Sequence, residues 1–280
     1  MLLHLELDDV PFSKDGLETV FTDAEKQNPL TVLVSGDSIQ STTGLREAVA
    51  FLAKRGHPSY LQLRLDFLKS RFEPEANTFF GENIRGLIVE ADGSIPPGDS
   101  GLAELLKTTS KLGKTVALRL NFFPEPSTEK LSSWLDYLDN TEISDLMLES
   151  GFEYLEEDEK KKTRYFELFI QHSSLLHRIP FQCSFLKEFK PKRCLYLDSK
   201  NPAVMYKNGA YVLCPYQAIE QMSRNETVQC VPDAIETMMR MQKIRLVNYV
   251  YAGKPFTCGD CVRENSKSEN ILKKGVQNDQ

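Results

Sequence analysis

No cysteine precedes Cys183, and no stretch of the chain is apolar over the length that a lipid bilayer requires. A membrane-spanning helix takes about 20 mostly apolar residues, so we expect no membrane span. The segment after Met1 turns acidic at Glu6, Asp8 and Asp9, which is not typical of a signal peptide. These absences predict a cytoplasmic protein.

An excess of positive charge is also absent. Lysine and arginine number 34 against 40 aspartates and glutamates, which gives a formal net charge of −6. Non-specific nucleic-acid binding relies on a basic surface, so the composition argues against a nucleic-acid partner. The 280 residues, 41% of them hydrophobic, can bury a substantial core, which excludes a short scaffold that depends on disulfides.

Six short apolar or β-branched runs occur before residue 180, and their starts recur at nearly constant spacing. Runs of this kind predict buried β-strands. The six runs are Leu2–Leu7, Leu30–Ser35, Tyr60–Leu65, Leu87–Ala91, Val116–Leu120 and Leu146–Glu149.

Segments of helical period separate these runs. One segment covers residues 102–112 and ends at Gly113, and another covers residues 45–52 before Gly56. A third begins at Ser127, a typical N-cap residue, and Tyr165–His177 reads as a further amphipathic helix. Because strand and helix alternate, we predict an α/β fold with a parallel sheet, an open (βα)6 TIM-like partial barrel over residues 1–180. A doubly wound sheet is the competing arrangement.

Polar residues stand at or near the ends of several predicted strands, where parallel α/β folds form their sites. The candidates for a functional pocket at the mouth of the barrel are Asp37, Glu90, Arg119 and Glu149. Arg119 is the most informative of them, because it lies inside the apolar run Val116–Leu120. Since an unpaired buried charge is costly, its side chain should point into a cavity or pair with a carboxylate.

All six cysteines fall between Cys183 and Cys261, and four of them form a pattern. Cys194 is followed by fourteen residues, Gly209, four residues and Cys214; Cys258 and Cys261 then form a CxxC pair. In a reducing compartment, clustered cysteines more often ligate metal than form disulfides. Four thiolates can bind one Zn²⁺ or an iron-sulfur cluster. Cys183 is expected in a strand and Cys230 in the core or a loop; either could replace a ligand.

The Cys-x14-Gly-x4-Cys and CxxC pattern resembles the C-terminal SPASM/twitch domain of radical S-adenosylmethionine enzymes. Residues 205–215, with Asn208-Gly209 between apolar runs and Cys214-Pro215 at the end, resemble the hairpin of that domain. Asn-Gly between apolar runs also predicts a hairpin independently. The resemblance implies a twitch-like domain over residues 181–262 that holds one auxiliary [4Fe-4S] cluster through the four cysteines. We expect residues 263–280 to be a disordered tail.

The chain departs from that family where the radical chemistry begins. The family binds its catalytic cluster through CxxxCxxC after the first strand, whereas residues 8–16 here contain no cysteine. The family's Gly-Gly-Glu-Pro stretch is replaced by Ser35-Gly36-Asp37-Ser38, which also puts binding of S-adenosylmethionine in doubt. The resemblance therefore implies an accessory binding or electron-relay protein that does not initiate radicals.

Two other interpretations stay open. The first is an enzyme that uses the polar residues at the barrel mouth without a radical, so the sequence leaves open whether the protein is an enzyme. The second is an interaction scaffold stabilised by Zn²⁺ at the four cysteines. Under the accessory hypothesis, the partner would be a separate radical enzyme, a peptide or a small molecule.

Overall fold

The structure is a computed structural model, and it describes eleven parts of the chain. These are residues 1–6, 14–26, 30–35, 50–66, 84–111, 113–123, 126–150, 159–186, 203–207, 210–212 and 235.

The described strands form one sheet in the order β7-β6-β5-β4-β3-β2-β1-β8-β9. Strands β1 to β7 follow one another in chain order, as in a (βα) barrel, whereas a doubly wound sheet reverses its order part-way. The α/β fold with a parallel sheet of eight strands, β1 to β8, is confirmed; β9 alone pairs in the antiparallel sense. The strands are β1 (Leu2–Glu6), β2 (Thr31–Ser35), β3 (Ser59–Arg64), β4 (Gly86–Asp92), β5 (Thr115–Phe122), β6 (Asp145–Ser150), β7 (Phe181–Cys183), β8 (Ala203–Lys207) and β9 (Ala210–Val212).

All six predicted runs are strands, with ends close to the predicted bounds. Predicted helix features are also confirmed. Residues 50–55 are helical before Gly56, and α5 (Leu102–Lys111) ends just before Gly113. Both glycines have positive φ, which L side chains rarely adopt. The Ser127 side chain caps α6 (Thr128–Asp139) by accepting a hydrogen bond from the backbone N–H of Lys130.

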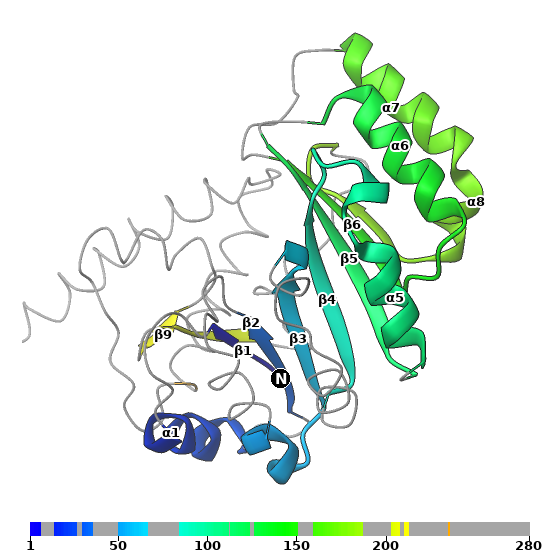
Figure 1. Cartoon of the computed structure of the whole chain (residues 1–280). Coiled ribbons are helices and arrows are strands. Elements are labelled where there is room, and N and C mark those ends of the chain that lie inside the picture. The colour runs from blue at the N-terminus through cyan, green and yellow to red at the C-terminus, as the bar shows by residue number, and fades with distance from the viewer. Residues whose placement is uncertain are drawn as a thin grey trace, which may run out of the picture. The chain divides into compact units, whose positions relative to one another are not determined.

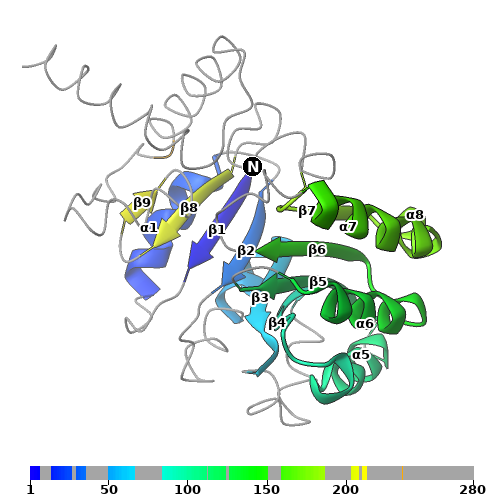
Figure 2. The ribbon, with the colours of Figure 1, turned by 90° about the horizontal axis from the view of Figure 1, so that it is seen from above.

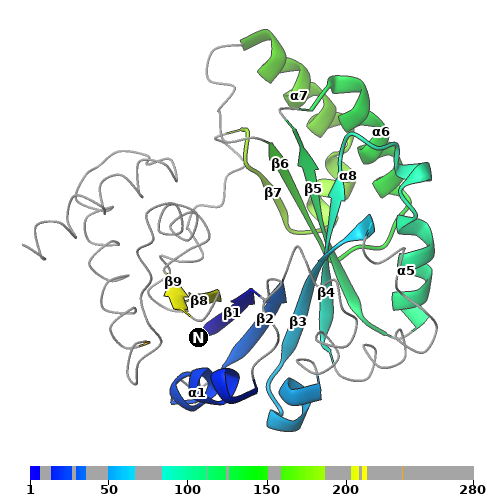
Figure 3. The ribbon, with the colours of Figure 1, turned by 60° about the vertical axis from the view of Figure 1, so that its left-hand side comes forward.

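The chain divides into two compact units, residues 33–192 and residues 1–32 with 193–280. In the unit of residues 33–192, helices α5, α6, α7 (Glu159–Gln171) and α8 (Ser173–Arg178) cover one face of strands β4 to β6 (Figures 1 and 3). Trp134 of α6 is fully buried, and its indole Nε1–H donates to the carbonyl of Gly93, 3.1 Å away. A side chain at Gly93 would overlap the ring of Phe122. The core of this unit therefore lies between the sheet and these helices.

The stretch Tyr165–His177 is not one helix, as the sequence analysis expected. It is broken at His172 between α7 and α8. The cause is a tertiary contact, since His172 is buried and its Nδ1 lies 2.6 Å from a carboxylate oxygen of Asp139 at the end of α6. A local pattern of apolar residues carries no signal for such a break.

The other unit contains β1, helix α1 (Lys14–Ala24), β8 and β9. Strand β8 lies beside β1 (Figure 2) and pairs with it in parallel, with Leu2 opposite Ala203 and Glu6 opposite Lys207. Strands β8 and β9 form an antiparallel pair in which Lys207 is opposite Ala210. The hairpin predicted from Asn208-Gly209 is thus confirmed, whereas the predicted domain boundary near residue 180 stays a prediction.

Candidate functional site

Along strands β3 to β6, successive residues alternate between the two faces of the sheet. One set of residues faces the helices, and the other set is on the opposite face. Except for the half-buried Ser150, the residues of the first set are buried, and except for the buried Gly86, those of the second are half-buried or exposed. This period of two is the signature of a sheet with one fully covered face. The second set includes four polar side chains from four adjacent strands, which we call the inner-face cluster: Gln62, Glu90, Arg119 and Glu149.

Arg119 joins two carboxylates of this cluster. Its Nε donates to Glu149 Oε2 at 2.7 Å and its Nη2 to Glu149 Oε1 at 2.8 Å, which makes a bidentate ion pair. Its Nη1 donates to Glu90 Oε1 at 3.0 Å. Parallel N–H···O bonds of this kind fix the guanidinium plane. The sequence analysis expected Arg119 to pair with a carboxylate, and that pairing is confirmed.

The strand register explains why these side chains meet. Glu90 and Arg119 are opposite one another on β4 and β5, whereas Arg119 is opposite Met147 on β6. Glu149 is two residues further along β6, so it is on the same face, towards the carboxyl end of the strand. The arginine stem can span this offset.

Glu90 is held by two donors on a single oxygen. Gln62 Nε2 donates to Glu90 Oε1 at 2.5 Å, and Arg119 Nη1 donates to the same atom. Within the described part of the chain, no donor contacts Glu90 Oε2. The side chains of Glu90, Glu149 and Arg119 are 17%, 26% and 30% exposed, so the cluster is partly withdrawn from water but can still be reached.

Among the described residues, the surroundings of the cluster add no net positive charge. Arg64 is opposite Glu90, but its guanidinium binds Asp66 through Nε at 3.1 Å and Nη2 at 2.8 Å. Asp92 adds a carboxylate two residues beyond Glu90, and its Oδ1 accepts from the backbone N–H of Ser94. In the described part of this face, carboxylates therefore outnumber guanidinium groups.

The structure brings together three of the four predicted mouth residues, Glu90, Arg119 and Glu149. Gln62 was missed by sequence reasoning, because a polar residue that alternates with leucines in a strand looks like an ordinary solvent-facing position. Asp37 lies outside the described residues, and so do Cys194, Cys214, Cys258, Cys261 and Cys230. Among the described residues, no group of three or more potential metal ligands is found. Cys183 is buried in β7, as the sequence analysis expected of a strand residue.

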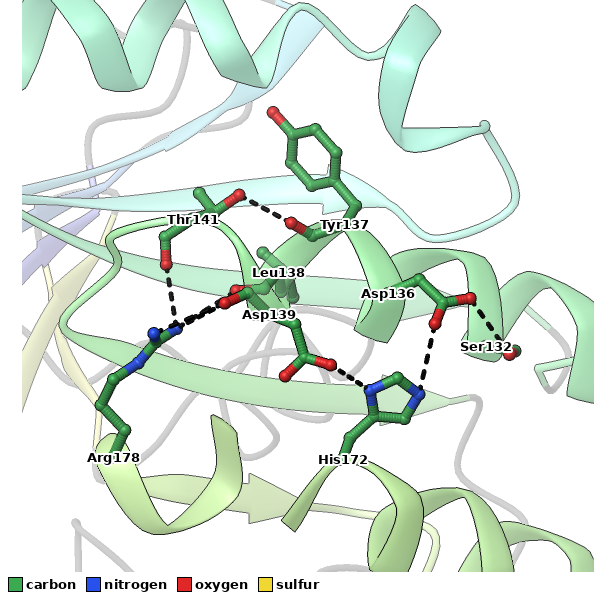
Figure 4. A network of polar contacts seen from close by, with 8 residues as sticks. All are labelled: Ser132, Asp136, Tyr137, Leu138, Asp139, Thr141, His172 and Arg178. Atoms are coloured by element: carbon green, nitrogen blue, oxygen red, sulfur yellow. Dashed lines mark hydrogen bonds and ion pairs between the residues drawn. The ribbon is translucent and has the colours of Figure 1, made fainter. Parts of the chain in front are cut away.

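A second polar network lies on the helices and has a structural role (Figure 4). Arg178 of α8 donates to the backbone carbonyls of Leu138, Asp139 and Thr141, at 3.2 to 3.5 Å. These contacts add donors to carbonyls at and just after the carboxyl end of α6, where the carbonyl of Leu138 also accepts from the backbone N–H of Thr141. His172 is placed between Asp139 and Asp136, with its Nε2 3.6 Å from Asp136 Oδ1. The network holds α8 against α6, and in it His172 acts as a packing residue.

Comparison with known proteins identifies the fold. No protein-family model and no curated protein matches the sequence. Among solved structures, the chain is similar to SuiB from Streptococcus suis, with a TM-score of 0.56, 12% identity, and coverage of 81% of this chain and 62% of SuiB. For SuiB bound to S-adenosylmethionine, the TM-score is 0.55 and the identity is 10%, with 76% of this chain and 58% of SuiB covered. For SuiB bound to its precursor peptide SuiA, the TM-score is 0.55 and the identity is 10%, with 81% of this chain and 61% of SuiB covered.

This similarity agrees with the α/β partial-barrel fold that the sequence predicted. At 10 to 12% identity it concerns the fold alone, and the chain spans about three fifths of the length of SuiB. Of the helices in the described residues, none combines the length and apolar character needed to cross a bilayer.

Proposed function

We propose that this protein is an accessory binding or electron-relay protein that holds one metal centre through Cys194, Cys214, Cys258 and Cys261. The observation that carries the proposal is the β8–β9 hairpin, whose loop contains Gly209 at the glycine position of the Cys-x14-Gly-x4-Cys pattern. Cys214 follows two residues after the end of β9. The hairpin and the radical-SAM-like fold support the resemblance on which the four ligands were chosen.

The donor set fits two metal centres. Four thiolates are the usual ligands of a [4Fe-4S] cluster and also of a structural Zn²⁺. We favour the cluster, because the resemblance is to a domain that carries an auxiliary cluster. Such a cluster supplies one-electron transfer when bound, whereas Zn²⁺ supplies only structural stability. Zn²⁺ would make the protein an interaction scaffold.

Radical initiation is not part of the proposal. No cysteine precedes Cys183, so residues 1–182 offer no CxxxCxxC ligands for a catalytic cluster. If the four clustered cysteines all bind the auxiliary centre, only Cys183 and Cys230 remain, and Cys183 is buried in β7. The electrons or the bound partner would therefore serve a separate radical enzyme.

A peptide is the partner that the similarity supports best. SuiB has been crystallised with its precursor peptide SuiA, and its fold is similar to that of this chain. A non-radical enzyme at the inner face is the alternative, favoured by the convergence of Glu90, Arg119 and Glu149. Arg119 already binds both carboxylates, and this arrangement suits a binding surface better than proton transfer.

Metal analysis tests the proposal. Protein purified without oxygen should be brown, with the broad visible absorption that is typical of iron-sulfur proteins. It should contain about four irons and four sulfides per chain. Iron, sulfide and zinc are measured on the same sample. Colourless protein with one zinc per chain would replace the relay by the zinc scaffold, and protein without either metal would overturn the proposal.

We also expect no saturable binding of S-adenosylmethionine. The CxxxCxxC motif is absent, and Ser35-Gly36-Asp37-Ser38 stands where the family has Gly-Gly-Glu-Pro. Both changes remove groups that hold this cofactor in the family that the sequence resembles. Isothermal titration calorimetry under anaerobic conditions checks this expectation, with S-adenosylhomocysteine as a second ligand. A binding isotherm that saturates at one site per chain would show that the cofactor site persists.

A further inference from the structure

We draw no further inference here: the strongest candidate, the exposed apolar surface of Ile95 and Phe123 in the loops that follow β4 and β5, carries none because nothing in the structure shows what covers it.

Discussion

Replacing Cys258 or Cys261 by alanine should remove the metal centre and unfold the part of the chain that depends on it. Three thiolates cannot complete a tetrahedral site, and metal binding and folding are coupled in small cysteine domains. The binding free energy of a structural Zn²⁺ reaches about 10 kcal/mol or more in zinc-finger peptides, far above the effect of an ordinary core substitution. Iron, sulfide and zinc analysis of the anaerobically purified variants measures the loss directly.

The structure also indicates which strands should loosen. Strand β8 pairs with β1 over five residues, and β9 pairs with β8, so both β1 and the hairpin belong to one compact unit. Hydrogen exchange should therefore accelerate in β1, β8 and β9, whereas β4, β5 and β6 keep their protection. Cys230→Ala is the control and should retain the metal. Unchanged metal content in the Cys258 and Cys261 variants would show that the ligands were chosen wrongly.

The sheet could be predicted from the sequence because its strands are coded locally. Each of the six runs is apolar, and each is followed by enough chain for a crossover helix. The chain-order arrangement of these strands was only one of two predicted topologies, since periodicity does not reveal neighbours. The parallel pairing of β1 with β8 was not predicted at all. About 200 residues separate the two strands, so no local pattern links them.

The inner-face cluster was partly predictable for a physical reason. Arg119 could be singled out because a charge inside an apolar run is costly to bury without a counter-charge. Glu90 and Glu149, near the ends of the neighbouring strands, are carboxylates that can supply it. Which carboxylate receives the bidentate pair depends on strand register, and register is set by packing across the sheet. Gln62 could not be found in this way, because a neutral amide does not require a counter-charge. The four cysteine ligands remain a prediction.

Replacing Arg119 by methionine should have the largest effect of any change on the inner face. The variant keeps an unbranched stem, but it leaves the carboxylates of Glu90 and Glu149 close together without a cation. Removing one partner of a fully buried ion pair costs about 3–5 kcal/mol. Glu90 and Glu149 are 17% and 26% exposed, so solvent screens part of the repulsion and we expect a loss of about 2 kcal/mol. Urea unfolding followed by Trp134 fluorescence measures it.

The matched control is Arg64→Met. Arg64 also makes a bidentate contact, with Asp66, but the two side chains are 55% and 66% exposed. Exposed ion pairs contribute about 0–1 kcal/mol, so this variant should unfold at nearly the wild-type urea concentration. If the loss in Arg119→Met comes from uncompensated carboxylates, adding Glu149→Gln to that variant should recover part of it, which a double-mutant cycle detects. Equal losses in Arg64→Met and Arg119→Met, or no recovery in the double variant, would mean that Arg119 stabilises the sheet by packing rather than by its charge.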